Sequence, residues 1–379
     1  MKRIAVLGCG LVGAAIARDL AREADFEVLV ADANAEALGR VAQAGVRIRE
    51  ADLSSPSEIA AVAREADTVV GALPGRLGLP MLEAVISAGK PIADISFSPE
   101  DPLALDALAR EKGVTAVVDC GVSPGLSNFA VGRAAAALAS IDGVRILVGG
   151  LPADRTRPFG YAILFSATDV IEEYTRLARI VEEGRVVTRA ALSEVEAVEV
   201  PGIGTLEGFL TDGLRTLLAT VPARSMVEKT LRYPGHADAM RGLRESGFFE
   251  SQPIEVSGRL VSPRSVTERL LSTAWKLGEK EEEFTYLRVS VAGRDASGAA
   301  KACVFELLDR PGPGGATSMA RTTGFPCSVA AAMLARGQYR DPGIRPLELV
   351  AADPGASSRF LEGLRARGLV LQETWSQER

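Results

Sequence analysis

The sequence has little of what several classes of site require. Among its 379 residues there is a single histidine, and the four cysteines (Cys9, Cys120, Cys303 and Cys327) are scattered without a CxxC pair. This spacing suggests neither a zinc site nor a disulfide framework. No basic run stands out, and the net charge of −6 argues against a surface for nucleic acid or another polyanion.

Long apolar stretches are also missing. None reaches the roughly 20 residues that a membrane-spanning helix needs. The apolar start MKRIAVLGCG is interrupted by Gly8, Gly10 and Gly13, so it predicts a buried strand and a turn rather than a signal peptide. We therefore expect a soluble, cytoplasmic protein in a reducing compartment. Because the chain is too long for one ordinary core, we expect two domains.

The first third of the chain alternates strand and helix patterns. Six segments are predicted as strands, with helical segments between them: KRIAVL, EVLVAD, VRIRE, DTVVGAL, PIADIS and VTAVVDCG. This alternation predicts an α/β fold, a doubly wound parallel sheet of the Rossmann type, over residues 1–124.

Beyond that point the pattern changes. EVEAVEV, IEVSGRL, FTYLRVSVAG and KACVFELL alternate polar and apolar residues, and YAILFSA also reads as a strand. Such alternation is typical of an antiparallel sheet with one wet face. The prediction is a second, α+β domain on a mostly antiparallel sheet over residues 125–319. Residues from about 320 to 379 are expected to pack back on the first domain.

A glycine-rich turn follows the first predicted strand. The stretch GCGLVG fits GxGxxG, and it lies between a strand and a helix as dinucleotide binding requires. Gly8 permits the tight turn, Gly10 lets the backbone approach a pyrophosphate, and Gly13 lets helix and strand pack closely. The helix N-terminus then offers free N–H groups and partial positive charge to the phosphates.

Asp32 ends the second predicted strand. A carboxylate there can accept hydrogen bonds from both ribose hydroxyls and repels a 2′-phosphate. Since Ala33 and Asn34 follow, no adjacent arginine is available for that phosphate, and we expect NAD rather than NADP. Asp52 and Leu53 are placed to flank the adenine, and Leu73 and Pro74 to lie near the nicotinamide end, with plain loop chemistry as the alternative for both pairs. The remaining predicted cofactor residues are Leu11, Val12, Ala33 and Cys120.

Two carboxylates stand at the carboxyl ends of later strands, where ligands of such sheets bind. Asp94 ends the fifth strand and Asp119 the sixth. Each is a candidate base or amine anchor. The alternative for both is a structural carboxylate that accepts hydrogen bonds from backbone N–H groups.

Several segments together resemble the saccharopine dehydrogenase-like family. They are GCGLVG, DISF, VDCGVSPGLSN, VGGLP, SATDVIEEYTRLARIVEEG, TDGLRTLL, TLRYPGH and ARTTGFP, in this order over nearly the whole chain. Within the family they look most like the lysine 6-dehydrogenases. The resemblance implies a Rossmann domain, a second domain that helps to enclose the substrate, and a homodimer.

The activity implied by the resemblance is NAD-dependent oxidation of the ε-amine of L-lysine. The products are ammonia and 2-aminoadipate 6-semialdehyde, which cyclises. Glutamate-forming saccharopine dehydrogenases carry a pattern like GLDPGIDH, whereas this chain has Ser123 before Pro-Gly and then Ser127-Asn128. This departure favours lysine over saccharopine. The alternatives are saccharopine as substrate, or a non-catalytic NAD-binding sensor.

The only histidine lies in TLRYPGH, and this segment supplies the substrate candidates. The α-carboxylate of lysine needs a partner, and arginine offers a planar fork for two charge-assisted hydrogen bonds. Arg232 is predicted for this role, with Thr230 on the same strand face. A surface or salt-bridge role for Arg232 is the alternative. Ser123, Tyr161 and Phe165 complete the expected substrate pocket, although the two aromatic residues could equally belong to the core.

The reaction also needs a proton acceptor. The ε-amine has a reference pKa near 10.4, and only its neutral form can assist the loss of a hydride. Asp94, Asp119 and His236 are the candidates, and the sequence does not choose among them. A histidine after a turn is more often a structural hydrogen-bonding group. No metal is expected, because the cofactor carries the redox step.

Overall fold

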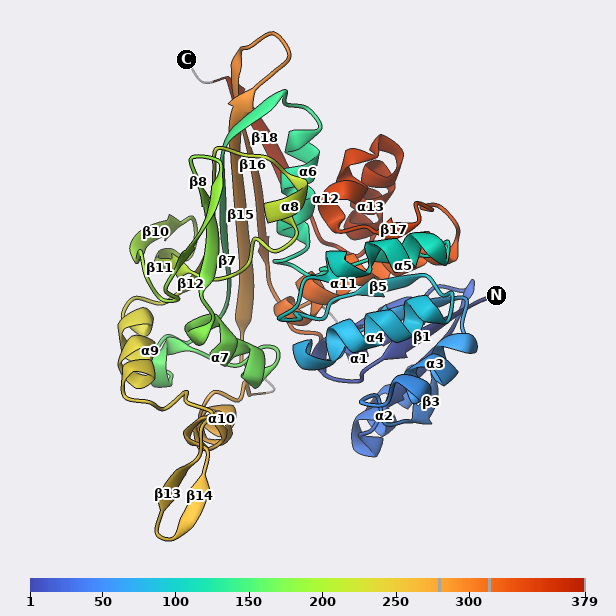
Figure 1. Cartoon of the computed structure of the whole chain (residues 1–379), viewed down its shortest axis with the longest axis horizontal. Coiled ribbons are helices and arrows are strands. Elements are labelled where there is room, and N and C mark those ends of the chain that lie inside the picture. The colour runs from blue at the N-terminus through green and yellow to red at the C-terminus, as the bar shows by residue number, and fades with distance from the viewer. Residues whose placement is uncertain (279–280, 313–314, 378–379) are drawn as a thin grey trace.

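The computed structural model describes residues 1–278, 281–312 and 315–377. Two large sheets lie side by side, one in each domain (Figure 1). Within the described residues, no helix combines the length and the apolar character needed to cross a membrane.

The first sheet is parallel throughout and has the order β17-β6-β5-β4-β1-β2-β3. Its direction of winding reverses between β1 and β4, which is the switch point where such sheets bind ligands. The strands are β1 (Lys2–Leu7), β2 (Phe26–Asp32), β3 (Arg47–Glu50), β4 (Thr68–Gly71), β5 (Ile92–Asp94), β6 (Thr115–Val117) and β17 (Gly343–Ile344).

Helices cover both faces of this sheet, which explains why its central strands are apolar without alternation. One core contains side chains of α1, α2 and α11, and the other contains side chains of α3, α4 and α5. The helices are α1 (Leu11–Leu20), α2 (Ala35–Ala42), α3 (Pro56–Arg64), α4 (Gly75–Ser87), η1 (Pro102–Leu105), α5 (Asp106–Glu111), α11 (Ser318–Ala335), α12 (Leu347–Ala352) and α13 (Pro354–Ala366).

The second sheet is mixed and mostly antiparallel, with the order β10-β11-β12-β7-β15-β16-β18. In addition, β8 pairs with β12, and β9 pairs with β8. Only β12 and β7 pair in parallel among its described strands. The strands are β7 (Ser140–Pro152), β8 (Ala178–Glu182), β9 (Arg185–Arg189), β10 (Glu196–Val200), β11 (Gly204–Leu210), β12 (Ser225–Arg232), β15 (Glu283–Arg294), β16 (Ala300–Asp309) and β18 (Gln372–Gln377). Together the two sheets confirm the predicted fold class.

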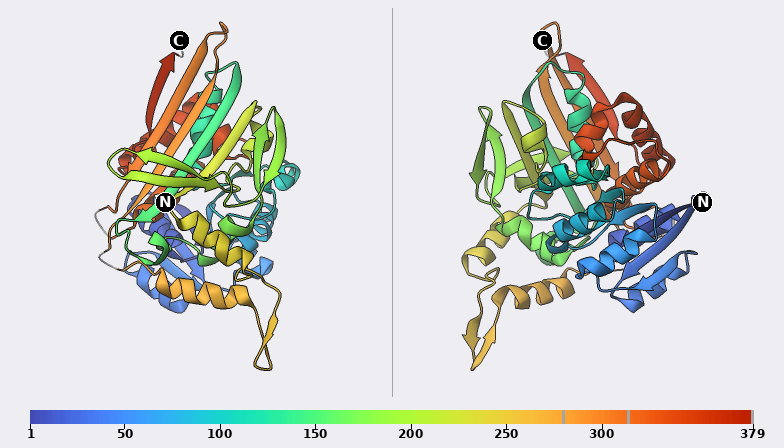
Figure 2. Two further views of the ribbon diagram at one scale, coloured as in Figure 1. Left: turned by 90° about the vertical axis from the view of Figure 1, so that its left-hand side faces the viewer. Right: turned by 45° about the vertical axis from the view of Figure 1, so that its right-hand side comes forward.

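Shorter elements surround the lower end of the second sheet in Figure 1. They are η2 (Pro158–Gly160), α7 (Ala167–Thr175), α9 (His236–Glu245) and α10 (Pro263–Ala274), while α6 (Leu126–Ala135) and α8 (Leu217–Thr220) lie nearer the first domain. The two-stranded hairpin of β13 (Ile254–Val256) and β14 (Arg259–Val261) projects from the body of the molecule (Figure 2).

Three details differ from the sequence-based expectation. The YAILFSA segment is extended but forms only an isolated bridge between Ile163 and Lys276, because its backbone bonds to Trp275 rather than to a sheet neighbour. The IEVSGRL segment forms the separate hairpin and does not join the large sheet. The C-terminal segment is shared: β17 joins the parallel sheet, whereas β18 pairs with β16 of the second sheet.

Candidate active site

A cavity of about 400 Å³ lies between the carboxyl edge of the parallel sheet and the second domain. Its lining combines the glycine-rich turn with side chains from α7 and β12, which are far apart in the sequence. The predicted site residues that line it are Gly8, Gly10, Leu11, Val12, Gly13, Asp32, Leu73, Pro74, Ser123, Tyr161, Phe165, Thr230 and Arg232. The fold therefore brings the predicted cofactor and substrate groups to one space.

The glycine-rich turn has the geometry that a pyrophosphate needs. Gly8 has φ +106°, and a Cβ there would lie 2.4 Å from the carbonyl oxygen of Ala72. A Cβ on Gly13 would lie 2.2 Å from the carbonyl oxygen of Gly8. Gly10 is the N-cap of α1, makes no side-chain cap, and has open space at its Cβ position. The first turn of α1 thus presents backbone N–H groups toward an accessible space, which fits a dinucleotide.

The carboxylate of Asp32 is fixed at the end of β2. Its Oδ2 accepts a hydrogen bond from the Cys9 amide at 2.6 Å, and its Oδ1 accepts one from the Asn34 amide at 2.7 Å. These bonds hold the carboxylate at the wall of the cavity. Its position suits the ribose hydroxyls of a dinucleotide bound along the turn.

Four residues assigned to the cofactor by position are not among the described residues that line the cavity: Ala33, Asp52, Leu53 and Cys120. Asp52 accepts hydrogen bonds from the amide and hydroxyl of Ser54, at 3.0 and 2.6 Å. Leu53 belongs to the core beneath the sheet, and Cys120 is fully buried. Asp52 matches the loop alternative, and a direct contact of Leu53 or Cys120 with the cofactor does not fit this arrangement.

The two candidate aspartates have structural partners. Asp94 is buried and accepts hydrogen bonds from the amide and hydroxyl of Ser96, at 3.0 and 2.8 Å. Burial raises the pKa of Asp94 to about 7. Asp119 forms an ion pair with Arg215, at 3.2 Å from Nε and 3.3 Å from Nη2. Neither aspartate is among the described cavity-lining residues.

His236 begins α9 inside an aromatic cluster. Its Nε2 lies 2.9 Å from the hydroxyl of Tyr174, and its Nδ1 lies 2.8 Å from the carbonyl oxygen of Phe159. Burial lowers the pKa of His236 to about 3, so the ring is neutral at ordinary pH. It also lies outside the described lining of the cavity. Direct proton transfer by Asp94, Asp119 or His236 therefore does not fit this structure.

Arg232 ends β12 with its guanidinium buried in the cavity wall. The Cζ atom lies 4.4 Å from the centre of the Tyr161 ring, and Nη2 donates to Glu173 Oε2 at 2.5 Å. Nη1 donates to the carbonyl oxygen of Leu231 at 2.9 Å. Nε is buried and has no partner among the described residues. Arg232 thus forms a salt bridge with Glu173, and its Nε–H is still able to donate a hydrogen bond to a ligand.

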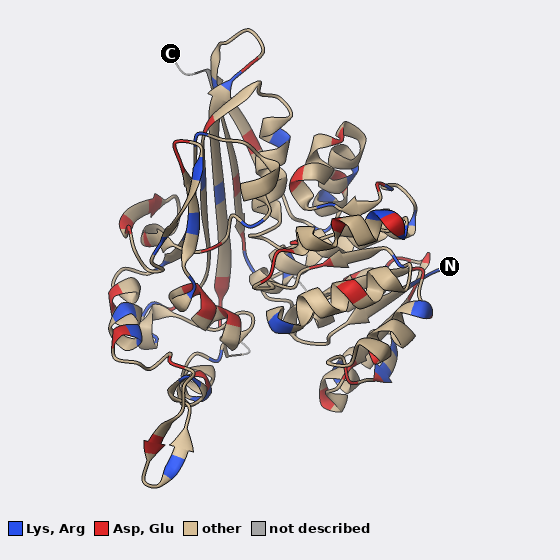
Figure 3. Cartoon of the chain, in the orientation of Figure 1, with Lys and Arg blue, Asp and Glu red and all other residues tan. Residues whose placement is uncertain are grey.

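Carboxylates that the sequence reasoning missed line the second-domain part of the cavity. They are Asp169, Glu172, Glu173, Asp212 and Glu228, against the two lining arginines Arg176 and Arg232. In Figure 3 the ribbon of α7 is red where it carries acidic residues. The spacing of 169, 172 and 173 puts three carboxylates on one helix face, a signal that TDVIEEY contains.

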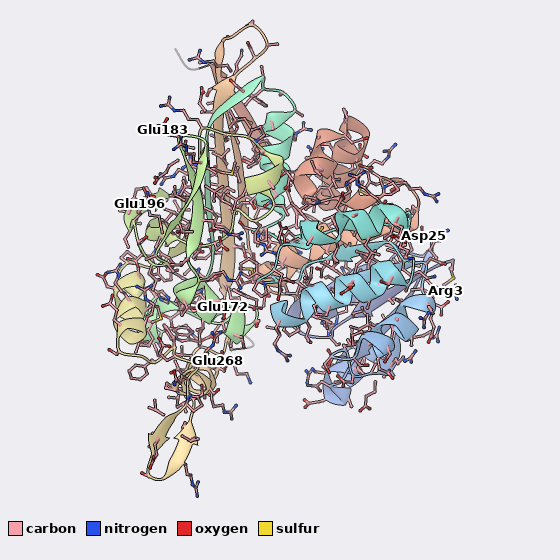
Figure 4. All side chains as sticks on the ribbon, viewed as in Figure 1. Arg3, Asp25, Glu172, Glu183, Glu196 and Glu268 are labelled. Carbon is pink, nitrogen blue, oxygen red and sulfur yellow. The ribbon has the colours of Figure 1, made fainter. Side chains whose placement is uncertain are left out.

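Most of these carboxylates are paired with a cation. Arg264 bonds to Glu172 and Glu268, and so joins α7 to α10; Figure 4 labels both of these glutamates. Arg179 makes two side-chain hydrogen bonds to Asp212, at 2.9 and 2.8 Å. These pairs hold the acidic wall in place.

Glu228 differs from them. It precedes Thr230 and Arg232 on β12 at intervals of two, so all three side chains share the cavity face of the strand. Its Oε2 accepts hydrogen bonds from the hydroxyl of Thr211 at 2.6 Å and from the amide of Gly213 at 3.2 Å. Burial raises the pKa of Glu228 to about 8. The period-two pattern of SMVEKTLR could have indicated this residue.

Two family models together match nearly the whole chain. Residues 4–117 match the model of the saccharopine dehydrogenase NADP binding domain, and residues 121–369 match that of the saccharopine dehydrogenase C-terminal domain. The chain therefore belongs to the saccharopine dehydrogenase family of amino-acid oxidoreductases.

Individual relatives are distant, and two of them match this chain over almost their whole length. The saccharopine dehydrogenase [NADP(+), L-glutamate-forming] of Saccharomyces cerevisiae is 21% identical, over 98% of this chain and 99% of that protein. The carboxyaminopropylagmatine dehydrogenase of Synechocystis is 22% identical, over 98% of each. The solved structure of apo saccharopine dehydrogenase from Saccharomyces cerevisiae superposes with a TM-score of 0.80 at 18% identity, covering 99% and 100% of the two chains. The narrower resemblance to lysine 6-dehydrogenases stays a prediction.

Proposed function

We propose that this protein is an NAD-dependent dehydrogenase that oxidises the ε-amine of L-lysine and releases ammonia. The observation that carries the proposal is the single cavity that joins the glycine-rich turn to Arg232 through an acidic wall. The turn is suited to a dinucleotide, and the far end is suited to an amino acid whose side chain is cationic.

The choice of NAD rests on Asp32. Its carboxylate is held toward the cavity by the amides of Cys9 and Asn34, where a 2′-phosphate would meet a fixed negative charge. The names of the matched family model and of the yeast relative specify NADP. If Asp32 binds the ribose hydroxyls as proposed, this chain uses NAD and differs from that relative in its cofactor.

Recognition of the amino-acid head group rests on Arg232 and Glu173. Their side chains form an ion pair in the cavity wall, and the Nε donor of Arg232 is buried without a described partner. A neighbouring cation and anion complement the α-carboxylate and α-ammonium of a free amino acid. Tyr161 packs against the guanidinium, and Phe165 lines the same cavity, where the aliphatic part of lysine would lie.

Carboxylates without an ion pair favour a substrate that carries an ammonium group. Five carboxylates from the second domain line the cavity, and three of them are paired with arginines. Asp169 and Glu228 have no ion pair among the described residues, so either can meet a substrate ammonium once it is ionised. L-lysine has two ammonium groups and one carboxylate, whereas saccharopine is a polyacid that would need more cationic contacts. Ser123, which stands where glutamate-forming enzymes carry an acidic residue, also lines the cavity.

The chemistry follows from this placement. When bound, the dinucleotide supplies the hydride acceptor. Oxidation of the carbon that carries the ε-amine leaves an iminium, and addition of one water gives the aldehyde and an ammonium ion. The chain itself has to hold the head group, take a proton from the substrate ammonium and keep the site apart from bulk water.

We also propose a homodimer formed through the second domain, as the family resemblance implies. Its support is an exposed edge: β18 ends the second sheet, Trp375 on it is 39% exposed, and Leu308 on the neighbouring β16 is 43% exposed. An unpaired edge strand with apolar side chains is suited to pairing with another chain. Light scattering of the purified protein tests it, and a monomeric mass would reject it.

The function is tested by mixing the purified protein with NAD or NADP and with lysine or saccharopine. Lysine should reduce NAD with release of ammonia, measured by the absorbance of the reduced cofactor and by an ammonia assay. Reduction only with saccharopine would favour the alternative enzyme. Dinucleotide binding without reduction by either substrate would favour the non-catalytic sensor.

A further inference from the structure

Glu228 differs in its charge partners from most carboxylates of the acidic wall, which consists of Asp169, Glu172, Glu173, Asp212 and Glu228. Glu172, Glu173 and Asp212 each have an arginine within ion-pair distance, but Glu228 has no such cation among the described residues. Its hydrogen bonds within the described chain all go to Oε2, so Oε1 remains for a ligand. Asp169 also lines the cavity without an ion pair in that set, and it serves below as the comparison.

The position of Glu228 is at the end of the cavity nearest the parallel sheet. Its Oε2 bonds to the amide of Gly213, two residues before Arg215. Arg215 in turn pairs with Asp119 beyond β6 and lies 5.2 Å from the centre of the Phe97 ring, which lines the cavity after β5. Glu228 is therefore close to the edge of the sheet where the reactive end of a dinucleotide is expected.

Arg232 marks the other end of the substrate region. It follows Glu228 by four positions on β12, which corresponds to about 13 Å along an extended strand. Tyr161 and Glu173 surround Arg232 at that end. A substrate whose α-carboxylate meets Arg232 can thus direct its side chain along β12 toward Glu228.

We propose that Glu228 is the catalytic residue that accepts the proton of the substrate ammonium, an inference that rests on the proposed amine oxidation. One N–H bond of R–CH₂–NH₃⁺ breaks and one O–H bond forms on the Glu228 carboxylate. The products are R–CH₂–NH₂ and a neutral carboxyl group. The electron pair stays on nitrogen, where it assists the loss of hydride from the neighbouring carbon.

The surroundings of Glu228 suit this step. Thr211 lies 2.6 Å from Glu228 Oε2 and 2.8 Å from the hydroxyl of Thr230, and this chain of hydroxyls orients the carboxyl group. The charged groups that face it are Glu173 on α7 and Asp212 beyond β11, each paired with its own arginine. Burial and these two carboxylates raise the pKa of Glu228 toward the range in which a base is effective at moderately alkaline pH.

A binding measurement tests the inference without turnover. Isothermal titration calorimetry in buffers of different ionisation enthalpy counts the protons released when lysine binds at pH 7 in the presence of reduced dinucleotide. Glu228 is mostly protonated at that pH and has to ionise to meet an ammonium, so the wild type should release close to one proton. Norleucine, which lacks the ε-amine, should release none. The Glu228→Gln variant should release none with either ligand.

Kinetics give the second measurement. The kcat/KM of the wild type should rise with pH up to about 8 and then level off. Glu228→Gln should lose this acidic limb and about 100-fold or more of kcat, since general base catalysis is worth about 10²- to 10⁴-fold. Glu228→Asp should restore part of both. A fluorescence titration with dinucleotide checks that the variants are folded, because only a folded first domain binds it.

Two variants serve as comparisons. Glu207→Gln removes a buried carboxylate of the neighbouring strand that caps α9 and is not among the described lining residues, so it should keep the acidic limb. The inference is overturned if Glu228→Gln retains the limb and the proton release, if Asp169→Asn removes them instead, or if the wild type releases no proton. Proton release that depends on Glu228 without reduction of NAD would reject the proposed function and the catalytic role with it, and would leave Glu228 only as a carboxylate that ionises when the amine binds.

Discussion

Arg215 and Asp119 form a buried ion pair that connects the two domains. Both side chains are 2% exposed, and the guanidinium also donates to the carbonyl oxygen of Ser98 at 2.5 Å. Both residues have φ of 50°, in the left-handed region that side chains other than glycine seldom adopt. The pair holds Arg215, which follows the Glu228 partner Gly213 by two residues, against the end of β6. It thereby sets the separation of the two halves of the cavity.

Removal of this carboxylate should destabilise the protein. Asp119→Asn leaves the Arg215 guanidinium buried without a counter-ion, and breaking such a pair costs about 3–5 kcal/mol. Urea unfolding of the variant should show this loss. Asp67→Asn is the control, because its pair with Arg3 is exposed and should contribute little. Equal stability of the Asp119 variant and the wild type would contradict a structural role for the pair.

Arg232→Lys should weaken the binding of the amino acid. Lysine cannot reproduce the planar fork, and a lost hydrogen bond to a charged group costs about 1.5–3 kcal/mol, so KM for the substrate should rise about 10- to 100-fold. Dinucleotide binding should not change, because Arg232 lies at the opposite end of the cavity. Steady-state kinetics and a fluorescence titration measure the two effects. An unchanged KM would show that Arg232 serves only its ion pair with Glu173.

Asp32→Ser should relax the choice of cofactor. The variant loses the charge-assisted bonds to the ribose and the repulsion of a 2′-phosphate, so the ratio of kcat/KM for NAD over NADP should fall about tenfold or more. Asp52→Asn is the matched control, since the Asp52 carboxylate bonds only to Ser54 in the described chain and the change should leave the ratio unchanged. A wild type that prefers NADP would refute this account of Asp32.

His236 should make the protein sensitive to acid. Its pKa is lowered to about 3 in the fold, whereas an unfolded histidine titrates near 6.5. Between these values the unfolded state binds more protons, so this contribution to stability is present above pH 6.5 and is lost as the pH falls toward 3. His236→Gln should reduce the slope of unfolding free energy against pH in that window. It should also keep the acidic limb of kcat/KM, and loss of that limb would restore His236 as a catalytic candidate.

Much of the cofactor end was predictable because it is local. A buried strand, three glycines at fixed spacing and a helix form one βα unit, and their conformations depend on neighbours within a few residues. The placement of Thr230 and Arg232 on the same face of their strand was predictable for the same reason, because residues two apart in a strand point to one side. Asp32 ends its strand in both the prediction and the structure, since parallel strands and their ends follow from the apolar pattern.

The proton acceptor was not predictable in this way. Asp94, Asp119 and His236 looked suitable in the sequence. In the fold, Asp94 bonds to Ser96 and Asp119 forms an ion pair with Arg215. His236 is buried in an aromatic cluster. Glu228 became a candidate only because α7, β12 and the loop after β11 meet at one cavity. The division of the C-terminal segment between β17 and β18 is a similar case. Periodicity shows which face of an element is apolar, but pairing between distant segments depends on the packing of the whole chain, and only the tertiary structure decides it.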